Sequence, residues 1–185
     1  QLAGPSKHFK SLLGLIMAKA YMDEYPESVL IFYDCEGGST PEYFAGVGID
    51  PDRVVYEMIT DIEELKKSLV NHLNDKGRKG NEGLQVGEKA FIFIDSIGNL
   101  ASMKEVEDAE EGKSVADMSR AKAIKGFFRI ITPKIKMKYQ IPMVFINHVY
   151  ATMDAYSAAK VGGGTGPELA SDTIIVLGRK QEMVK

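Results

Sequence analysis

The chain has 185 residues, of which 44% are hydrophobic and 26% are charged, and its formal net charge is −3. These values predict one α/β domain with a full core, and the small negative charge means that any nucleic-acid binding requires a local patch. The one cysteine, Cys35, excludes an internal disulfide and a multi-cysteine zinc site, and the absence of a long apolar run or visible signal peptide predicts no membrane association.

The segment from Gly4 to Ser11 predicts a phosphate-binding loop that runs directly into a helix. The general pattern is Gly, four residues, then Gly-Lys-Ser/Thr; Gly4, Lys10 and Ser11 match it, and Phe9 replaces the second glycine. Backbone N–H groups would face a polyphosphate. Lys10 would place its ammonium on the β- and γ-phosphates, and Ser11 would bind a Mg²⁺ ion. The predicted cradle consists of Gly4, Pro5, Ser6, Lys7, His8, Phe9, Lys10 and Ser11. Taken alone, the segment fits equally well a Gly-Pro turn before a lysine on an ordinary helix.

The next elements alternate between helix and strand. Residues 11–22 are apolar on most faces and predict a helix buried against a sheet, which ends before Pro26. Residues 29–33 form a short apolar run, typical of a parallel strand covered on both faces, and acidic residues and glycines follow it. Thr40 and Pro41 then predict the start of a short helix.

The middle of the chain repeats this order. Residues 53–56 predict a short strand, and 60–63 resemble a capping box that opens a helix to about Leu73. A polar loop over 74–88 precedes a second buried strand, 90–94, with Asp95 at its end.

The remaining chain combines two long irregular segments with a helix and two strands. Residues 100–113 are acidic without an apolar period and predict a mobile loop, whereas 114–136 predict a long helix that Pro133 kinks or ends. Its expected inward residues are Met118, Ala121, Ile124, Phe128 and Ile131. The last predicted elements are strand 142–147, a long segment over 148–171, and strand 173–178. This alternation predicts a mostly parallel central sheet flanked by helices, with right-handed crossovers.

Three polar residues follow predicted strands, and the carboxyl ends of parallel strands share the edge where ligands bind in open α/β sheets. Asp95 there could hold Mg²⁺, Glu36 could orient and deprotonate water, and His148 could bond a γ-phosphate. Each residue taken singly fits a structural role at a strand end or turn at least as well. The nucleotide-site hypothesis therefore depends on their coincidence with the loop at Gly4.

The chain resembles the RecA-type recombinases, and most closely their bacteriophage members, over nearly its whole length. The motifs that carry this resemblance are Ala3-Gly4-Pro5-Ser6-Lys7 with Phe9-Lys10-Ser11, Phe32-Tyr33-Asp34 with Glu36, Ile94-Asp95-Ser96 with Asn99-Leu100-Ala101-Ser102, Ile146-Asn147-His148, and residues 162–167. The Phe-Lys-Ser ending, unusual in phosphate loops, is similar to that of the phage members. The resemblance implies a RecA-like P-loop NTPase core and an ATP-dependent filament on single-stranded DNA that pairs it with a homologous duplex, in a phage-infected bacterial cell.

The resemblance also implies roles for individual residues. Lys10 and Ser11 would bind phosphate and Mg²⁺, Glu36 would activate water, Asp95 would be the acid of the metal site, and Tyr43 would stack on adenine. His148 stands where bacterial RecA has a glutamine that links the γ-phosphate to a DNA-binding loop, so the tightness of that coupling is open.

Two long segments match the DNA-binding loops of the family. The first covers about 103–115, where the acidic run is expected to point away from DNA or to contact a neighbouring subunit; the second covers about 149–164. The residues expected to contact DNA are Val115, Arg120, Tyr150, Met153, Tyr156, Lys160, Gly162, Gly163 and Gly164.

Three classes of function remain open from the sequence. The leading one is a DNA-dependent ATPase recombinase core; the alternatives are a RecA-fold helicase motor or ATP-binding paralogue without strand exchange, and a non-enzymatic interaction module. Because only three residues precede the phosphate loop, we also expect the chain to be a fragment that lacks the family's N-terminal oligomerisation segment and C-terminal region.

Overall fold

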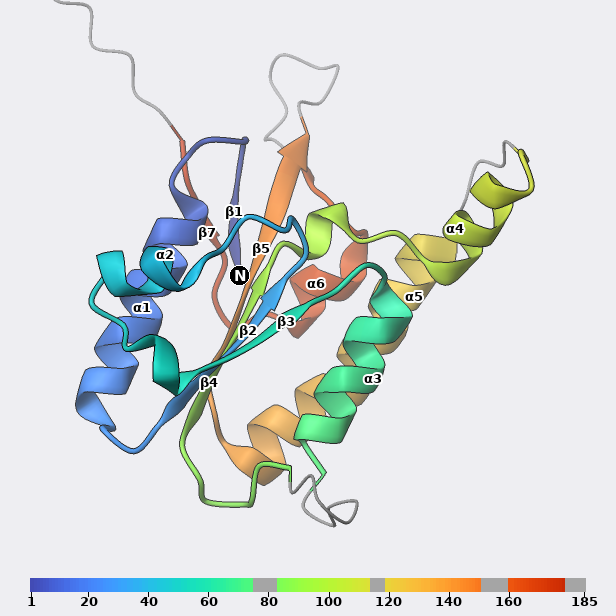
Figure 1. Cartoon of the computed structure of the whole chain (residues 1–185). Coiled ribbons are helices and arrows are strands. Elements are labelled where there is room, and N and C mark those ends of the chain that lie inside the picture. Colours follow the sequence, from blue (N-terminus) through green and yellow to red (C-terminus); the bar gives the residue numbers. More distant parts are fainter. Residues whose placement is uncertain (75–82, 114–118, 151–159, 179–185) are drawn as a thin grey trace, which may run out of the picture.

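The computed structural model describes residues 1–74, 83–113, 119–150 and 160–178 (Figure 1). Its α-helices are α1 (Lys10–Glu24), α2 (Pro41–Gly46), α3 (Ile62–His72), α4 (Met103–Glu110), α5 (Ser119–Pro133) and α6 (Thr165–Ala170). Its strands are β1 (Leu2–Gly4), β2 (Val29–Asp34), β3 (Val54–Met58), β4 (Ala90–Asp95), β5 (Met143–Tyr150), β6 (Lys160–Val161) and β7 (Ile175–Val176). Two short 3₁₀ turns, η1 (Pro51–Arg53) and η2 (Ile97–Asn99), and a π-helix, η3 (Lys134–Tyr139), complete the elements.

The strands form one sheet in the order β3-β2-β4-β5-β1-β7. All neighbours along this path are parallel, and among the strands of the described residues only β6 runs antiparallel, against the end of β5. The predicted fold class, a mostly parallel sheet flanked by helices, is therefore confirmed. In the described parts of the chain, no helix is long and apolar enough to cross a membrane.

Alternate residues of the central strands face two different cores. Leu30 and Phe32 of β2 pack with α1 and α2, whereas Ile31 and Tyr33 pack with α3 and α5. Figure 1 shows these two helical layers on opposite sides of the sheet. This arrangement explains why the strand sequences are apolar without alternation, since both faces are covered.

Helix α1 lies unusually close to β4. A Cβ atom at Gly14 would come within 2.2 Å of Phe93 Cζ, so only glycine permits this approach. The helix that begins at the predicted phosphate loop is thereby fixed against the middle of the sheet.

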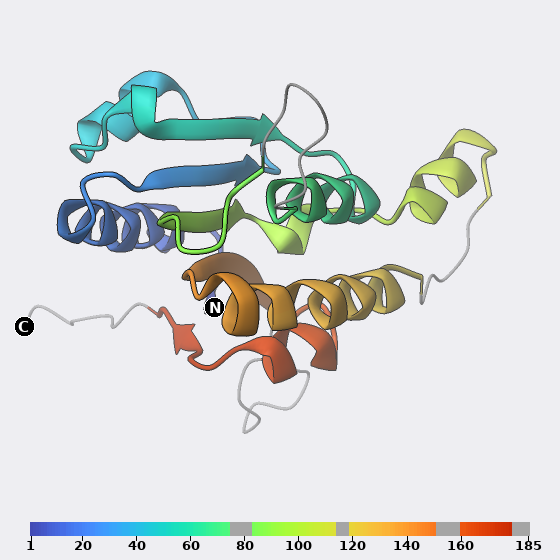
Figure 2. The same ribbon diagram turned by 90° about the horizontal axis from the view of Figure 1, so that it is seen from below.

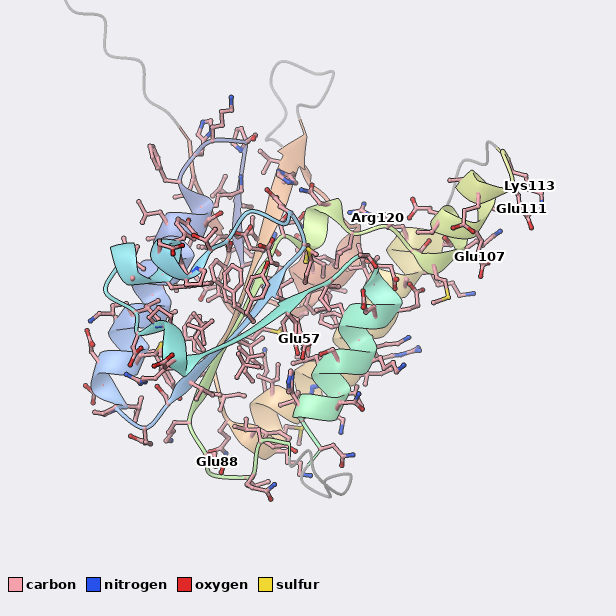
Figure 3. All side chains as sticks on the ribbon, viewed as in Figure 1. Glu57, Glu88, Glu107, Glu111, Lys113 and Arg120 are labelled. Carbon is pink, nitrogen blue, oxygen red and sulfur yellow. The ribbon has the colours of Figure 1, made fainter. Side chains whose placement is uncertain are left out.

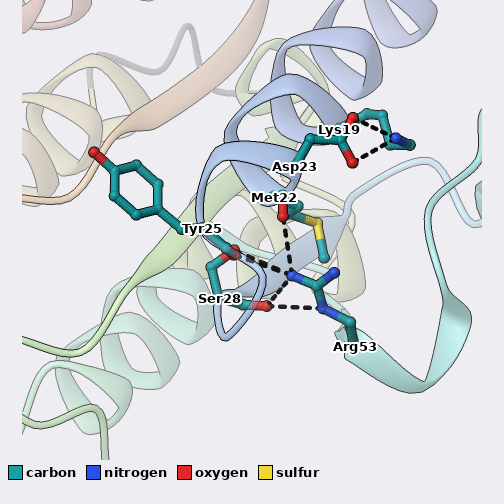
Figure 4. Close-up of polar contacts among 6 residues, drawn as sticks. All are labelled: Lys19, Met22, Asp23, Tyr25, Ser28 and Arg53. Atoms are coloured by element: carbon teal, nitrogen blue, oxygen red, sulfur yellow. Dashed lines mark hydrogen bonds and ion pairs between the residues drawn. The ribbon is translucent and has the colours of Figure 1, made fainter.

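Arg53 holds the far end of α1 (Figure 4). Its Nη2 donates to the carbonyls of Met22 and Tyr25, at 3.3 Å each, and to the Ser28 carbonyl at 2.8 Å. Arg53 was predicted as the first residue of a strand, but it belongs to η1, and β3 runs from Val54 to Met58.

The cap of α3 differs by one residue from the prediction. Asp61, not Thr60, is the N-cap, and its side chain accepts from the Glu64 N–H at 2.7 Å. The Thr60 N–H donates instead to Glu64 Oε2 at 2.9 Å. The helix ends at His72, in agreement with the predicted boundary.

The prediction of a mobile loop over 100–113 was wrong, because this segment contains helix α4. Ser102 and Glu105 form a complete capping box, and Lys104 pairs with Asp108 one turn later, at 2.9 Å. Short-range bonds of this kind support a helix that has no apolar face. No residue of α4 is buried, and the helix projects from the body in both views of the molecule (Figures 1 and 2).

The long helix predicted over 114–136 is only partly as expected. Ile124, Phe128 and Ile131 of α5 are buried, but Ala121 is exposed; Met118 lies outside the described residues. Pro133 ends the α-helix, and the chain continues as η3.

The segment over 148–171 is more regular than predicted. Strand β5 continues through His148 to Tyr150, β6 pairs back onto it, and Thr165–Ala170 form α6. The last strand, β7, has only two residues and pairs with β1.

Candidate nucleotide-binding site

Most residues of the predicted nucleotide site line one hollow of about 430 Å³ at the carboxyl edge of the sheet, whereas Gly4 and Pro5 of the predicted cradle are not among its lining residues. Its lining residues are Ser6, Lys7, His8, Phe9, Lys10, Ser11, Leu12, Glu36, Tyr43, Asp95, Ile146 and His148. They come from the β1–α1 loop, the start of α1, the turn after β2, the C-terminal parts of β4 and β5, and helix α2. The structure therefore brings together groups that lie up to 142 positions apart in the sequence.

Strand register explains why these groups meet. Gly4 of β1 lies opposite His148 of β5, and Asp34 of β2 lies opposite Asp95 of β4. Because parallel strands end at the same edge, the residues that follow them share one surface. A Cβ atom at Gly4 would lie 2.8 Å from the Leu177 carbonyl oxygen, so glycine also permits the close passage of β1 beside β7.

The start of α1 has the properties of an anion site. Phe9 at the N-cap position makes no side-chain capping bond, and the first turn contains no acidic residue. The first N–H groups of a helix have no intrahelical acceptor, and the helix dipole favours negative charge there. Phe9 adopts the left-handed region, φ 56°, as does Lys7, φ 61°, which lets the loop curl in front of these N–H groups. The geometry fits a polyphosphate.

Lys10 is 6% exposed and folds back on the loop, where its Nζ donates to the Pro5 carbonyl at 2.7 Å. Burial lowers the pKa of the Lys10 ammonium, while the nearby carboxylates of Asp95 and Glu36 partly oppose this effect. The cation thus shares the lining of the hollow with two acids, Asp95 and Glu36, whose charges favour its protonated form.

Asp95 and Ser11 form the pair that could hold Mg²⁺. Burial raises the pKa of Asp95 to about 6, with further increases from Glu36 and Asp34, although a hydrogen bond from the Ser11 side chain lowers it. Among the described residues no group of three or more His, Cys, Asp or Glu could hold a metal. The hydroxyl-carboxylate pair fits Mg²⁺, which commonly takes one or two protein oxygens and completes its shell with water and phosphate.

Tyr43, expected to stack on adenine, lies in α2 and lines the same hollow. Burial is the main cause of its raised pKa, followed by the charge of Asp95. Thr40 occupies the N-cap position of this helix as predicted but makes no side-chain capping bond.

Asp34 organises the turn that carries Glu36, a role that the sequence interpretation missed. Its carboxylate accepts four backbone N–H bonds of 2.7–3.1 Å, from Glu36, Gly37, Gly38 and Ser39. The Tyr56 hydroxyl donates a fifth bond, at 3.0 Å. Burial alone would raise the pKa of Asp34, but these bonds hold it below its usual value.

Glu36 is connected to His148 through Asn99. Glu36 Oε1 accepts from Ser96 Oγ at 3.0 Å and from Asn99 Nδ2 at 2.8 Å, and Asn99 Oδ1 lies 3.0 Å from His148 Nε2. In the sequence, Ser96 and Asn99 are recognisable only as part of a motif that carries the family resemblance. No local pattern marks their contacts, because the partners lie 49 to 63 residues away.

Burial is the main cause that lowers the pKa of His148, followed by the positive charge of Lys10. The charge of Glu36 partly opposes this lowering of the pKa, and the charge of Arg120 adds to it. The imidazole is therefore held toward its neutral form at physiological pH. A neutral imidazole still donates one hydrogen bond, as an interaction with a phosphate oxygen requires.

The described part of the second candidate DNA loop is attached to this histidine. The Gly162 N–H donates to the His148 carbonyl at 2.9 Å, and Asn147 Nδ2 donates to the Gly162 carbonyl at 2.8 Å. Gly163 and Gly164 both have positive φ, 83° and 70°, and lead into α6. Tyr150 and Lys160 contribute backbone to the β5–β6 pair.

Arg120 lies at the start of α5, next to η2 (Figure 3). Its guanidinium donates to the carbonyls of Leu100 at 2.7 Å, Gly98 at 2.5 Å and Ile97 at 3.4 Å. In this structure the side chain therefore holds the turn that carries Asn99. Three other expected DNA contacts, Val115, Met153 and Tyr156, lie outside the described residues.

A comparison with known proteins finds a bacteriophage protein that is similar to this chain. The chain is 47% identical over 180 residues to a protein of Enterobacteria phage T4 named "Recombination and repair protein". The match covers 97% of this chain and 44% of that protein, so the chain spans less than half of its relative's length. No protein-family model matches the chain.

Proposed function

We propose that this chain is the ATP-binding core of a RecA-type phage recombinase, similar to UvsX. In this proposal the protein binds ATP and Mg²⁺, assembles as a filament on single-stranded DNA, promotes pairing with homologous duplex DNA, and hydrolyses ATP. The observation that carries the proposal is the convergence of the phosphate loop, Glu36, Asp95 and His148 on one hollow. The relative's printed name supports the assignment to phage recombination and repair.

The residues of the hollow have complementary roles in this proposal. The loop N–H groups and Lys10 hold the phosphates, and Lys10 exchanges its Pro5 carbonyl partner for phosphate oxygens. Ser11 and Asp95 hold Mg²⁺, which when bound neutralises charge on the phosphate oxygens. Glu36, which lines the hollow and lies in the turn held by Asp34, orients water and accepts its proton.

His148 links nucleotide to DNA in this proposal. It lines the hollow with its side chain and bonds the glycine end of the second candidate loop with its carbonyl. DNA phosphates would approach the glycines at 162–164, while the loop's aromatic residues and Lys160 would supply stacking and charge. Binding should weaken as salt rises, because phosphate contacts release counterions.

Assembly and location complete the proposal. We place the protein in the infected bacterial host cell, where neighbouring subunits of a filament supply part of each ATP site. Groups supplied in trans are worth about 10³–10⁵ in rate in other phosphate-loop enzymes, so turnover should depend on assembly.

The test is ATP hydrolysis by the full-length protein with and without single-stranded DNA, together with a strand-exchange assay. Glu36→Gln keeps the shape of the side chain and removes the base, so nucleotide should still bind while turnover falls by about 10²–10⁴-fold. Glu27→Gln, an exposed position in the turn before β2, is the matched control and should retain turnover.

Each outcome distinguishes a class of function. DNA-stimulated hydrolysis with strand exchange supports a recombinase. Hydrolysis without exchange indicates a helicase-type motor or a paralogue, and the absence of nucleotide binding indicates an interaction module. A Glu36→Gln protein that hydrolyses ATP at the parent rate would show that another residue orients the water.

A further inference from the structure

Asn99 occupies a position in the site that the proposed roles leave unexplained. It ends η2, the turn that directly follows β4, and its side chain lies between Glu36 and His148. It does not line the hollow, so it is not placed to contact nucleotide in this structure. Its two bonds instead connect groups that come from two different strand ends.

The direction of these bonds follows from elementary chemistry. An ionised carboxylate can only accept, so the Asn99 amide must present Nδ2 to Glu36 Oε1. The amide oxygen then faces His148 Nε2, and that nitrogen must be the donor. The bridge thus fixes one tautomer of a neutral His148, with the proton on Nε2, and leaves Glu36 Oε2 for a further partner.

The turn beneath Asn99 is built to hold His148 closely. A Cβ atom at Gly98 would lie 2.6 Å from His148 Cδ2, so no other residue fits there without moving the imidazole. Arg120 anchors the same turn from α5 through the carbonyls of Ile97, Gly98 and Leu100. Asn99 itself is exposed, but the bonds from Arg120 to the turn that carries it fix its position.

We infer that Asn99 is a positioning residue that couples the proposed base, Glu36, to the DNA-linked His148. The inference rests on the proposed function and deepens it. A phosphate oxygen in the hollow and Asn99 Oδ1 compete for the same donor, the His148 Nε2–H. When His148 turns to the phosphate, the Asn99 amide loses its bond to the imidazole. The amide is then held only by Glu36, so it restrains the Glu36 carboxylate less firmly. Movement of His148 by the second loop is transmitted to Glu36 in the same way.

The test uses Asn99→Ala and Asn99→Asp in the full-length protein. Alanine removes both bonds, and aspartate keeps an acceptor for His148 but puts a negative charge beside Glu36. We expect both variants to lower DNA-stimulated kcat by about tenfold or more, the effect of losing at least one net hydrogen bond, with the KM for ATP within about twofold of the parent. Asn71→Ala, an exposed asparagine of α3, is the matched control.

A second set of variants separates coupling from general damage. Gly98→Ala keeps every polar atom but displaces the imidazole, and it should reproduce the kinetic effect of Asn99→Ala. In a double-mutant cycle, Asn99→Ala and His148→Ala should be strongly non-additive in DNA-stimulated kcat, whereas Asn71→Ala and His148→Ala should be additive. Thermal unfolding of each variant identifies any that fail to fold.

The outcomes distinguish this inference from the proposed function. If the parent hydrolyses ATP and the Asn99 variants keep their DNA-stimulated kcat, or if the cycle with His148 is additive, the coupling role is wrong and the ATPase assignment stands. If the parent neither binds nor hydrolyses ATP, the proposed function fails first. A loss of nucleotide affinity equal to the loss of rate would make Asn99 a binding residue and would overturn the positioning role.

Discussion

Helices α1 and α4 start in opposite ways, and the contrast shows how a site differs from a scaffold. At α4, Ser102 and Glu105 satisfy the first N–H groups through a capping box, and the helix stands away from the body with no buried residue. At α1, Phe9 caps nothing and no acid lies in the first turn, although the helix is buried against the sheet. The unsatisfied helix start is the one that faces the hollow. A helix end that lacks its own partners is available to a ligand, whereas a self-capped end serves only stability.

The largest expected effect tests whether α1 binds an anion. Lys10→Ala removes the buried ammonium at the start of α1 and should lower ATP affinity by about 100-fold or more, since charge-assisted bonds to phosphate are lost. Calorimetry with ATP and Mg²⁺ measures this. Lys19→Ala, on the same helix but paired with Asp23, should retain the parent affinity. Equal affinities for the two variants would contradict the difference between the helix starts.

The second prediction concerns the acid that faces α1. Because burial raises the pKa of Asp95 to about 6 from 3.8, the ligand-free folded state holds this proton more tightly than the unfolded chain. Its contribution to stability is therefore present below about pH 4 and is lost as the pH rises through 6. Asp95→Asn should increase the unfolding free energy by about 2 kcal/mol more at pH 7 than at pH 4. Urea unfolding across this range measures the difference, and a pH-independent difference would refute it.

The third prediction tests the self-capped helix. Ser102→Ala removes the capping box of α4, so the unfolding free energy should fall by about 1–2 kcal/mol while ATP affinity stays at the parent value. Urea unfolding and calorimetry measure the two quantities. A fall in ATP affinity without a fall in stability would show that α4 is not merely a scaffold.

The smallest expected effect sharpens the comparison at Phe9. A left-handed backbone costs an L-residue about 1–2 kcal/mol and glycine almost nothing, so Phe9→Gly should be more stable than Phe9→Ala by about 1 kcal/mol. Ala20 is an exposed position in the interior of α1, where alanine is more favourable than glycine. Ala20→Gly should therefore be destabilising by about 1 kcal/mol. Thermal unfolding of the four proteins tests both. If glycine is also the worse residue at position 9, the loop does not hold Phe9 in this conformation.

The sequence by itself determined the layers of the fold. Uninterrupted apolar runs at 29–33 and 90–94 identified strands covered on both sides, and the polar residues that follow them identified the ligand edge. The sequence alone identifies Lys10, Ser11, Glu36, Asp95 and His148 as site residues, and the structure brings all five to one hollow. These features are local, so a short window of residues contains them.

The missed helix α4 has a different cause. Its signal, a serine followed three residues later by glutamate, is present in the sequence at Ser102 and Glu105, but the acidic composition and missing apolar period favoured a loop. Short-range capping and ion pairing replaced burial as the source of helix stability.

Only the tertiary structure decided which polar atoms meet. Asn99 reaches Glu36 across 63 positions and His148 across 49, and neither contact has a sequence pattern. Both arise because β2, β4 and β5 are adjacent and parallel, so that the turns leaving them converge within hydrogen-bonding distance. Residue type and spacing specify the strands, but the order and register of the strands in space specify the partners of each side chain.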